Sequence, residues 1–277
     1  MPLLIKKGHQ VIPANYPEFN LLDQKSVTKA VGDQTIDVVI HLAGMSHVVE
    51  CENNKDQAFR INVEGTKNLL SAVLELNRPV HFIFASTAQV YKAPTADETN
   101  VTFTEDRPIQ PQNYYASTKL EAEKAILEAT QNPNLTATIL RLFNHSHKSQ
   151  APTFFLPHLY QQLASGETKI PVGNLDLARD IGSIRDLVKA IAKVVDQNDW
   201  QLEIFNICSG RGKNLRTLAN LLAKKMNVKA DFVVDPKRVR PGEPQTLIGS
   251  HQKLSGRIDW KPAIISEEQL VDDFLCE

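Results

Sequence analysis

Two residues at the start of a predicted helix, Tyr115 and Lys119, have the types and the spacing of a proton-transfer pair. A separation of four residues puts both side chains on one face of a helix. A free tyrosine has a pKa near ~10, but a neighbouring ammonium group favours the phenolate and lowers that pKa. The pair could therefore interconvert a carbinol and a carbonyl. The same spacing is also common on solvent-facing helices, where it has no catalytic role.

Thr87 closely follows an apolar run, Val80–Ala85, that predicts a buried strand. In open α/β sheets, ligands bind outside the carboxyl ends of the strands. Thr87 is therefore placed to hydrogen-bond the same substrate oxygen that Tyr115 would protonate. The alternative is a hydroxyl group that only caps a loop.

Short apolar segments alternate with longer amphipathic ones along the chain. The apolar runs are continuous, which is typical of parallel strands buried on both faces. The alternation of strands and helices indicates a doubly wound α/β fold. The predicted strands are Gln10–Ala14, Asp37–Leu42, Val80–Ala85, Thr136–Leu140 and Glu203–Ile207, and the predicted helices are Gln57–Leu76, Tyr115–Gln131 and Ile184–Val195.

The second half is less regular and predicts a smaller α+β lobe. Phe154–Ser165 predicts a helix that ends at Gly166. Leu215–Met226 predicts another helix, followed by a strand at Asp231–Val234. The final segment, Ser266–Phe274, opens with a capping-box pattern, because a glutamine stands three residues after its serine.

The composition excludes several classes of protein. With 42% hydrophobic and 23% charged residues, the 277-residue chain has an ordinary globular balance, and its net charge of −1 argues against bulk binding to nucleic acid or an anionic membrane. No apolar run reaches the roughly 18 residues of a membrane span. The cysteines Cys51, Cys208 and Cys276 are too dispersed for a disulfide framework or a zinc motif, so we expect reduced thiols, a cytoplasmic protein and no metal site.

Several motifs, in order along nearly the whole chain, resemble the extended short-chain dehydrogenase/reductase family of sugar-nucleotide epimerases, dehydratases and reductases. They are His41-Leu-Ala-Gly44, Asn62-Val-Glu-Gly-Thr66, Ala85-Ser-Thr-Ala-Gln-Val-Tyr91, Asn113-Tyr-Tyr-Ala-Ser-Thr-Lys119 and Phe205-Asn-Ile-Cys-Ser-Gly210. The resemblance implies a Rossmann-like fold, NADP or NAD as cofactor, a nucleoside-diphosphate sugar as substrate and a homodimer. It implies catalytic roles for Thr87, Tyr115 and Lys119, and cofactor contacts from Leu42, Ala43, Asn62, Ser86, Tyr115 and Lys119.

Three segments of the second half resemble GDP-mannose 4,6-dehydratases and GDP-4-dehydro-6-deoxy-mannose reductases more narrowly. They are Arg141-Leu-Phe-Asn-His145, Val172-Gly-Asn-Leu-Asp176 followed by Arg179-Asp180, and Arg240-Pro-Gly-Glu243. By that resemblance Asn144, Arg179, Arg240 and Glu243 would contact the nucleotide sugar. Arginine forks suit a pyrophosphate, and a carboxylate suits ribose hydroxyl groups. Surface salt bridges for the arginines and a loop role for Glu243 are the alternatives.

Two positions depart from the pattern of these relatives. The dehydratases have a glutamate two residues after the catalytic threonine, and this chain has Gln89. A glutamine cannot be a general base, so reduction or epimerisation is favoured over water loss. In addition, His147-Lys-Ser149 stands where the family usually has Gly-Pro-Gly.

The largest departure is the phosphate-binding turn. The family binds its dinucleotide on a glycine-rich turn after the first strand, and these 277 residues contain no such turn. Asn15 stands where an acidic residue would favour NAD, so NAD and NADP both remain open. We therefore expect a parallel sheet that lacks its first strand and has bare strand edges. A start site assigned too late, a degraded copy and a stable natural variant are three explanations, and the upstream reading frame would distinguish them.

We thus expect residues 1–145 to form a dinucleotide-binding domain and residues 146–277 mainly a substrate lobe, with 184–210 returning to the main sheet. The expected activity is the NAD(P)-dependent reduction or epimerisation of a nucleoside-diphosphate sugar, most like the reduction of a 4-keto-6-deoxy sugar nucleotide. The alternatives are a non-catalytic sugar-nucleotide-binding protein and a dimer partner of an intact relative.

Overall fold

Contacts between residues divide the chain into two units. The computed structural model describes residues 1–32, 34–95, 98, 100–239 and 245–276. The first unit comprises residues 1–93, 105–142 and 192–205, and the second comprises residues 94–104, 143–191 and 206–277. The segment that returns to the first unit is thus shorter than the expected 184–210, and residues 94–104 belong with the second unit.

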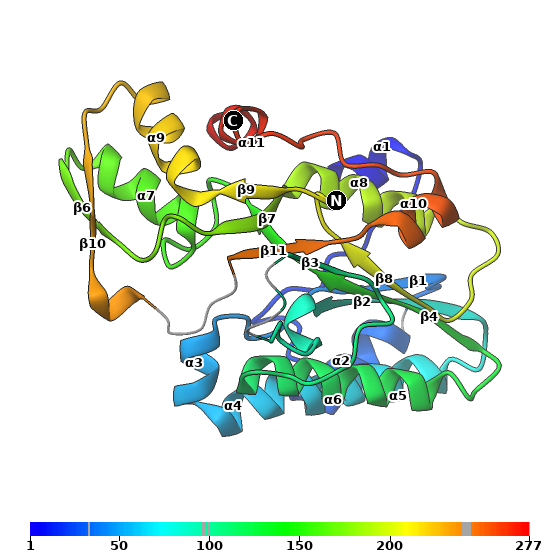
Figure 1. Cartoon of the computed structure of the whole chain (residues 1–277). Coiled ribbons are helices and arrows are strands. Elements are labelled where there is room, and N and C mark those ends of the chain that lie inside the picture. The colour runs from blue at the N-terminus through cyan, green and yellow to red at the C-terminus, as the bar shows by residue number, and fades with distance from the viewer. Residues whose placement is uncertain (33, 96–97, 99, 240–244, 277) are drawn as a thin grey trace. The chain divides into compact units, whose positions relative to one another are not determined.

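A parallel sheet forms the centre of the first unit. Its strands follow the order β1 (Val38–His41), β2 (Val80–Thr87), β4 (Leu135–Leu142) and β8 (Glu203–Ile207). The parallel pairing of β1, β2 and β4 confirms the predicted α/β class. The side chains of β2 are buried almost throughout, which explains why its apolar run is continuous rather than alternating. Figure 1 shows α5 and α6 lying against one face of this sheet.

Five helices of the first unit form a layer beside the sheet. They are α2 (Gln24–Gly32), α3 (Val48–Asn53), α4 (Lys55–Phe59), α5 (Gly65–Glu75) and α6 (Tyr114–Ala129). The predicted helix Gln57–Leu76 is present as α4 and α5, joined by the π-helical segment η1, Arg60–Glu64. Such π segments often occur at functional sites, because the extra residue redirects side chains. The pattern of apolar residues gave no sign of this interruption.

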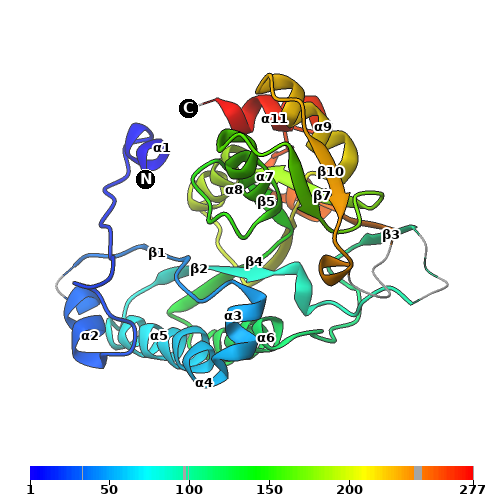
Figure 2. The same ribbon diagram turned by 90° about the vertical axis from the view of Figure 1, so that its left-hand side faces the viewer.

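The N-terminal segment differs from its prediction. Residues 9–15 form no strand, so the strand predicted at Gln10–Ala14 is wrong. Instead the chain begins with α1, Pro2–Lys6, which has no buried residue, and Figure 2 shows an extended path from α1 to α2. A strand needs a neighbour to pair its backbone groups. Among the described residues β1 pairs only with β2, so residues 10–14 have no strand beside β1 to pair with.

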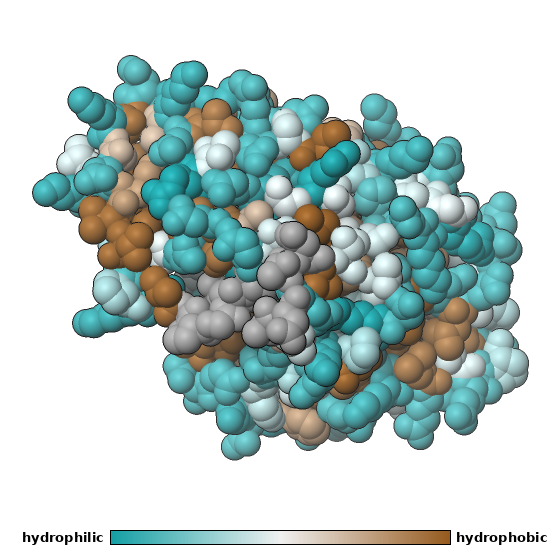
Figure 3. All heavy atoms as spheres, viewed as in Figure 1, coloured by the Kyte–Doolittle hydropathy of each residue, from teal (hydrophilic) through white to brown (hydrophobic). Residues whose placement is uncertain are grey.

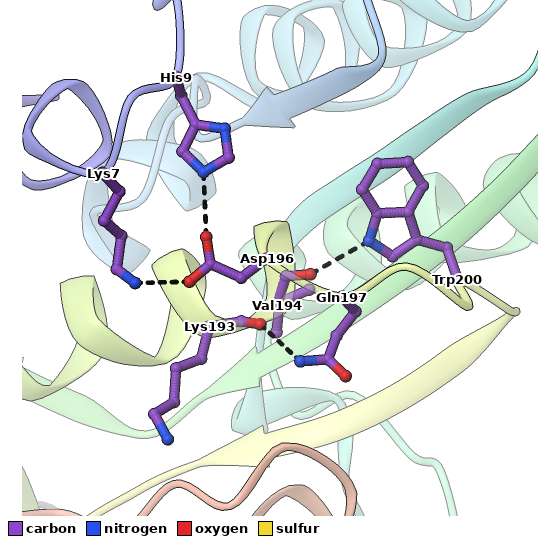
Figure 4. A network of polar contacts seen from close by, with 7 residues as sticks. All are labelled: Lys7, His9, Lys193, Val194, Asp196, Gln197 and Trp200. Carbon is purple, nitrogen blue, oxygen red and sulfur yellow. Dashed lines mark hydrogen bonds and ion pairs between the residues drawn. The ribbon is translucent and has the colours of Figure 1, made fainter.

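A small polar network attaches this segment to the remainder of the first unit. The Asp196 carboxylate accepts a hydrogen bond from Lys7 Nζ at 2.6 Å and lies 3.0 Å from His9 Nε2 (Figure 4). Burial alone would raise the pKa of Asp196, but the hydrogen bonds from Lys7 and His9 outweigh it and lower that pKa. The network therefore stabilises the attachment only while Asp196 is ionised.

Replacing Asp196 by asparagine should loosen the first residues of the chain without unfolding the unit. The pair is partly exposed, so we expect a cost below about 1 kcal/mol. The Asp196 carboxylate stabilises the attachment fully above about pH 4. This stabilisation is lost as the pH falls through the lowered pKa of Asp196. Trypsin should cleave after Lys6 and Lys7 faster in D196N than in the wild-type protein at pH 7, because the N-terminal segment is more loosely attached. Equal cleavage rates in both proteins would contradict it.

Buried neutral histidines are a feature of the first sheet. Burial lowers the pKa of His41 to about 3 and that of His81 to about 4. His81 lies 2.8 Å from the Thr136 hydroxyl and 2.9 Å from the Thr138 hydroxyl, and it stacks on Trp200 at 5.0 Å. These partners satisfy both nitrogens of the uncharged His81 ring. A second proton on the ring of His41 or His81 is therefore unfavourable in the fold.

The first unit should therefore lose stability in mild acid. An unfolded histidine has a pKa near ~6.5, so the unfolded chain binds the proton first as the pH falls. Each such histidine lowers the free energy of unfolding by at most about 1.4 kcal/mol per pH unit between about pH 6.5 and its folded pKa. Urea unfolding followed by Trp200 fluorescence should show that the free energy of unfolding falls less from pH 7 to pH 5 in His81→Gln than in the wild-type protein. Equal losses in both proteins would be the contrary result.

The second unit has its own sheet and core. Its strands follow the order β3 (Asn100–Phe103), β11 (Thr246–Gly249), β7 (Ala178–Ser183) and β5 (Asn144–Ser146), and β9 (Gly212–Asn214) pairs antiparallel with β7. A separate pair joins β6 (Lys169–Val172) to β10 (Asp231–Val234). Figure 3 shows apolar side chains gathered over β10, where Val233 and Val234 are each 47% exposed.

All four helices predicted for the second half are confirmed. They are α7 (Phe155–Ala164), α8 (Ile184–Val195), α9 (Leu215–Lys225) and α11 (Glu267–Leu275). Ser266 and Gln269 make both hydrogen bonds of the capping box. Gly166 follows α7 with a φ of +83°, the left-handed conformation that favours glycine after a helix. The sequence did not indicate α10 (Gln252–Ile258) or the short helical turns η2 (Ala88–Val90) and η3 (Pro236–Arg238).

Candidate active site

Helix α6 carries the predicted proton-transfer pair. The Asn113 side chain caps the helix by accepting a hydrogen bond from the Ala116 backbone N–H at 2.9 Å. The Glu52 carboxylate accepts another from the Tyr114 backbone N–H at 2.6 Å. These two caps fix the first turn, from which Tyr115 projects. Lys119 lies one turn later and is only 5% exposed.

The end of strand β2 carries Thr87. It is the last residue of the strand, and its hydroxyl oxygen accepts a hydrogen bond from the Gln89 backbone N–H at 3.2 Å as the chain turns into η2. The Thr87 side chain also interacts with the Tyr115 hydroxyl and lowers the pKa of Tyr115, which burial raises. Two residues that are 28 positions apart in the sequence are thus brought together, as an arrangement for binding one oxygen atom requires.

A cavity lies beside this pair. Its volume is about 130 Å³. That is smaller than the roughly 300–1,000 Å³ typical of whole-ligand sites, so it can take one ring or sugar at most. Four of the predicted site residues, Leu42, Ser86, Tyr115 and Lys119, contribute to its wall, together with Gly44, Met45, Ser46, Ala85 and Leu142. The wall does not include Thr87, which was predicted to be catalytic, or Ala43 and Asn62, which were predicted to contact a cofactor.

Asn62 instead fixes the loop that forms one wall. Its side-chain oxygen accepts a hydrogen bond from the Met45 backbone N–H at 2.8 Å, and its amide nitrogen donates to the Met45 carbonyl at 3.0 Å. The same nitrogen lies 2.9 Å from the Thr118 hydroxyl on α6. A side chain at Gly44 would come within 2.8 Å of the Asn62 oxygen, so only glycine allows this close approach.

The pKa of Tyr115 corrects the expectation from the sequence. Burial raises it to about 12, whereas a neighbouring Lys119 was expected to lower it. The Lys119 ammonium lies over the Phe84 ring, 4.2 Å from its centre, and has no hydrogen-bond acceptor among the described residues. Burial also lowers the pKa of Lys119 to about 8, although Glu123 opposes this. In this structure Tyr115 is therefore a protonated donor at neutral pH, beside a lysine with unused donors.

Gln89 has a defined role in the site. Its side-chain oxygen accepts a hydrogen bond from Asn113 Nδ2 at 2.7 Å, which ties η2 to the start of α6. The residue thus joins the two elements that carry Thr87 and Tyr115. A neutral amide in this place supplies no base for the removal of a proton.

Two of the predicted substrate-binding residues, Asn144 and Arg179, belong to the second unit. Asn144 is exposed on β5, and Arg179 is half-buried on the paired strand β7. Arg179 Nη1 donates a hydrogen bond to the Ala178 carbonyl at 2.8 Å. Arg240 and Glu243 lie outside the described residues. Whether any of these four contacts a nucleotide sugar stays a prediction.

A buried ion pair was missed by sequence reasoning. Arg141 and Glu123 form it with two hydrogen bonds, of 3.1 Å from Nε and 2.7 Å from Nη2, and their side chains are 6% and 1% exposed. Glu123 also accepts a hydrogen bond from the Ser86 hydroxyl at 2.5 Å. The one available signal was the position of Glu123, four residues after Lys119 and so on the same helix face.

Two further observations concern a metal site and a membrane-spanning helix. Among the residues that the structure describes, no group of three or more histidine, cysteine, aspartate or glutamate side chains could hold a metal ion. Within the same residues, every helix is too short or too polar to cross a membrane.

Comparisons with known proteins identify the family of the chain. Residues 7–274 match the family model described as GDP-mannose 4,6 dehydratase. The chain is 30% identical over 239 residues to GDP-6-deoxy-D-mannose reductase of Pseudomonas aeruginosa, covering 84% of this chain and 78% of that protein. It is 26% identical over 282 residues to UDP-glucose 4-epimerase of Lactobacillus helveticus, covering 95% of this chain and 82% of the epimerase.

Among solved structures, RMD from Pseudomonas aeruginosa complexed with NADPH has a TM-score of 0.83 at 26% identity, covering 96% of this chain and 89% of that one. The match of the family model to nearly the whole chain, the reductase relative and this shared fold lead to one assignment. The chain belongs to the GDP-mannose 4,6-dehydratase family, within the extended short-chain dehydrogenases/reductases that act on sugar nucleotides.

Proposed function

We propose that the protein is an NAD(P)-dependent reductase of a 4-keto-6-deoxy nucleoside-diphosphate sugar, with the GDP sugar as its first candidate substrate. The observation that carries this proposal is that Tyr115, whose pKa burial raises and the Thr87 side chain at the end of β2 lowers, lines one cavity together with Lys119. A tyrosine that is protonated at neutral pH can give its proton to a carbonyl oxygen, as reduction requires. Reduction is favoured over epimerisation because the relative that is 30% identical over 239 residues is a reductase.

Each catalytic residue has a defined role in this proposal. Thr87 orients the C4 carbonyl oxygen through its hydroxyl group, and Tyr115 gives that oxygen its proton. Lys119 helps to hold the cofactor ribose with ammonium donors that have no acceptor among the described residues, and its charge stabilises the phenolate left after proton transfer. Gln89 argues against dehydration, because an amide cannot act as the base that water loss requires.

The residues fit the nicotinamide end of a dinucleotide. The cavity has room for a single ring, and its wall combines apolar groups with the Ser86 hydroxyl and the Lys119 ammonium. When bound, NADPH or NADH supplies the hydride for the C4 carbonyl. No glycine-rich turn for the pyrophosphate is present in these 277 residues, so we assign no residue to that part of the cofactor.

The substrate's nucleotide is proposed to bind to residues of the second unit. Arg179 would pair with the pyrophosphate through its guanidinium fork, and Asn144 would hydrogen-bond the sugar nucleotide. Arg240 and Glu243 would add a second fork and a partner for ribose hydroxyl groups. The support for these four roles is the resemblance of their sequence segments to the family.

Oxidation of reduced nicotinamide tests the function directly. The purified chain is mixed with NADPH or NADH and GDP-4-keto-6-deoxy-mannose, and the absorbance of the reduced cofactor is followed. We expect oxidation with the keto sugar and neither oxidation nor water loss with GDP-mannose. Conversion of GDP-mannose to its keto form, or no reaction with the keto sugar, would contradict the proposal.

One observation favours a second candidate, a non-catalytic protein that binds sugar nucleotides: the absence of the glycine-rich turn from these residues. Calorimetry distinguishes the two. Binding of a GDP sugar without measurable binding of NADPH or NADH would favour the second candidate.

A homodimer in the cytoplasm also remains a proposal. Phe59 on α4 and Leu127 on α6 are 38% and 37% exposed, and such side chains suit an interface between subunits. Light scattering of the purified chain would measure its oligomeric state.

A further inference from the structure

The ion pair between Glu123 and Arg141 contacts both ends of the segment that holds Thr87. At the first end, Ser86 donates its hydroxyl proton to Glu123 at 2.5 Å. At the other end, the Tyr91 ring lies against the Arg141 guanidinium, 4.9 Å from Cζ, and the two side chains are hydrogen-bonded. Thr87 and the turn η2 lie between these two anchors. The pair therefore fixes the backbone from which Thr87 projects.

The register of the sheet explains how these groups meet. Ser86 on β2 is directly paired with Arg141 on β4, so both side chains leave the sheet on the same face. Glu123 reaches them from α6, which contacts both strands. Both carboxylate oxygens are used, one by Ser86 and Arg141 Nε and the other by Arg141 Nη2. Removing the carboxylate would leave a guanidinium and a hydroxyl group buried without their partner.

Glu123 also supplies the charge nearest to Lys119 on its own helix. The ionisable groups that face Lys119 come from three elements: His41 from β1, Cys51 from α3, and Tyr115 and Glu123 from α6. His41 is neutral because burial lowers its pKa to about 3. The Cys51 thiol and the Tyr115 hydroxyl are neutral because burial raises their pKa values. Glu123 is thus the anionic partner of the ammonium within this group.

We propose that Glu123 is a positioning residue of this site: clamped by Arg141, it anchors the Thr87 segment through Ser86 and keeps the Lys119 ammonium protonated. This inference rests on the proposed function for its catalytic meaning. The charge relationship between Glu123 and Lys119 can nevertheless be measured without cofactor or substrate. Glu123 itself touches neither, since its oxygens are occupied by protein donors.

Titration of Lys119 tests the inference. The full chain is labelled with a trace of acetic anhydride over a range of pH, and mass spectrometry follows the peptide that contains Lys119. The midpoint of its reactivity gives its pKa. We expect the midpoint to fall by about one pH unit in Glu123→Gln, because an anionic neighbour that favours the charged amine has been removed.

Glu121→Gln is the matched control. Glu121 lies on the same helix but is exposed, and it pairs with Lys124 at 2.7 Å. The midpoint for Lys119 should be unchanged in this variant. A Lys119 midpoint that is equal in wild type and in folded Glu123→Gln overturns the inference.

A second variant covers the case in which Glu123→Gln does not fold. The double variant E123Q/R141M removes both charges, so neither is left buried without its partner, and no guanidinium remains to repel Lys119. A lowered Lys119 midpoint supports the inference, and an unchanged midpoint overturns it. A wild-type chain that reduces no keto sugar would contradict the proposed function but would not alter the midpoints.

Discussion

Tyr115→Phe is expected to lower kcat for reduction of the keto sugar by about 10²- to 10⁴-fold, the usual contribution of a positioned general acid. The change removes only the hydroxyl group that interacts with Thr87 and leaves the ring in place. The KM for the sugar and the affinity for the cofactor should change little, since the proton is delivered only in the reaction. Steady-state kinetics with calorimetry of cofactor binding would measure both effects.

The adjacent tyrosine is a matched control for this experiment. Tyr114 is also half-buried on the first turn of α6, but its ring faces Lys55, whose ammonium lies 5.3 Å from the ring centre. Tyr114→Phe should leave kcat unchanged because no interaction with Thr87 is lost. If Tyr115→Phe kept the wild-type kcat, the assignment of the proton donor would be wrong.

Asp180→Ala should destabilise the second unit by about 3–5 kcal/mol, the cost of removing one partner from a buried charged network. The Asp180 side chain is fully buried and accepts hydrogen bonds from Ser209 N at 2.7 Å, Ser209 Oγ at 2.6 Å, Gly210 N at 3.0 Å and Gly249 N at 3.1 Å. Three backbone N–H groups would lose their acceptor, and each such loss carries a desolvation cost. Lys213, 1% exposed, would also lose a nearby opposite charge.

A single tryptophan can report on this unit. The chain has two, and Trp260 is the one in the second unit, so Trp200→Phe leaves it as the only tryptophan signal. Urea unfolding is then compared among the parent, Asp180→Ala and Asp176→Ala. Asp176 is 70% exposed and pairs with Arg216 on the surface, so its removal should cost less than about 1 kcal/mol. Equal midpoints for the two alanine variants would refute the central role of Asp180.

The predictions that the structure confirms depend on patterns of residues that lie close together in the sequence. The start of α6 was predicted at Tyr115 from an amphipathic segment, and the structure shows that the helix begins at Tyr114 with Asn113 as its cap. Strand β2 could be predicted because both of its faces are buried, which leaves a continuous apolar run. Local spacing and composition carry these signals, since a helix cap is formed by residues close in the chain and a continuous apolar run is a local pattern.

The expectations that failed depend on distant partners. Residues 10–14 have the apolar pattern of a strand, but a strand also requires a neighbour for its backbone groups, and none beside β1 is described. The direction of the pKa shift of Tyr115 was wrong because it depends on how deeply the ring is buried. The π-helical segment at Arg60–Glu64 was missed because its apolar pattern resembles that of the helices on either side.

The sequence by itself therefore determined the parallel α/β class, the family and the residue types available for proton transfer. Only the tertiary structure decided how those residues are held. The contact of Glu123 with Ser86 and Arg141 requires the register of β2 on β4 and the packing of α6 over both strands. Asp180 likewise binds backbone groups from segments 29 and 69 residues away. Contacts at such separations, and the burial that sets the charge state of Tyr115 and Lys119, arise only when the chain has folded.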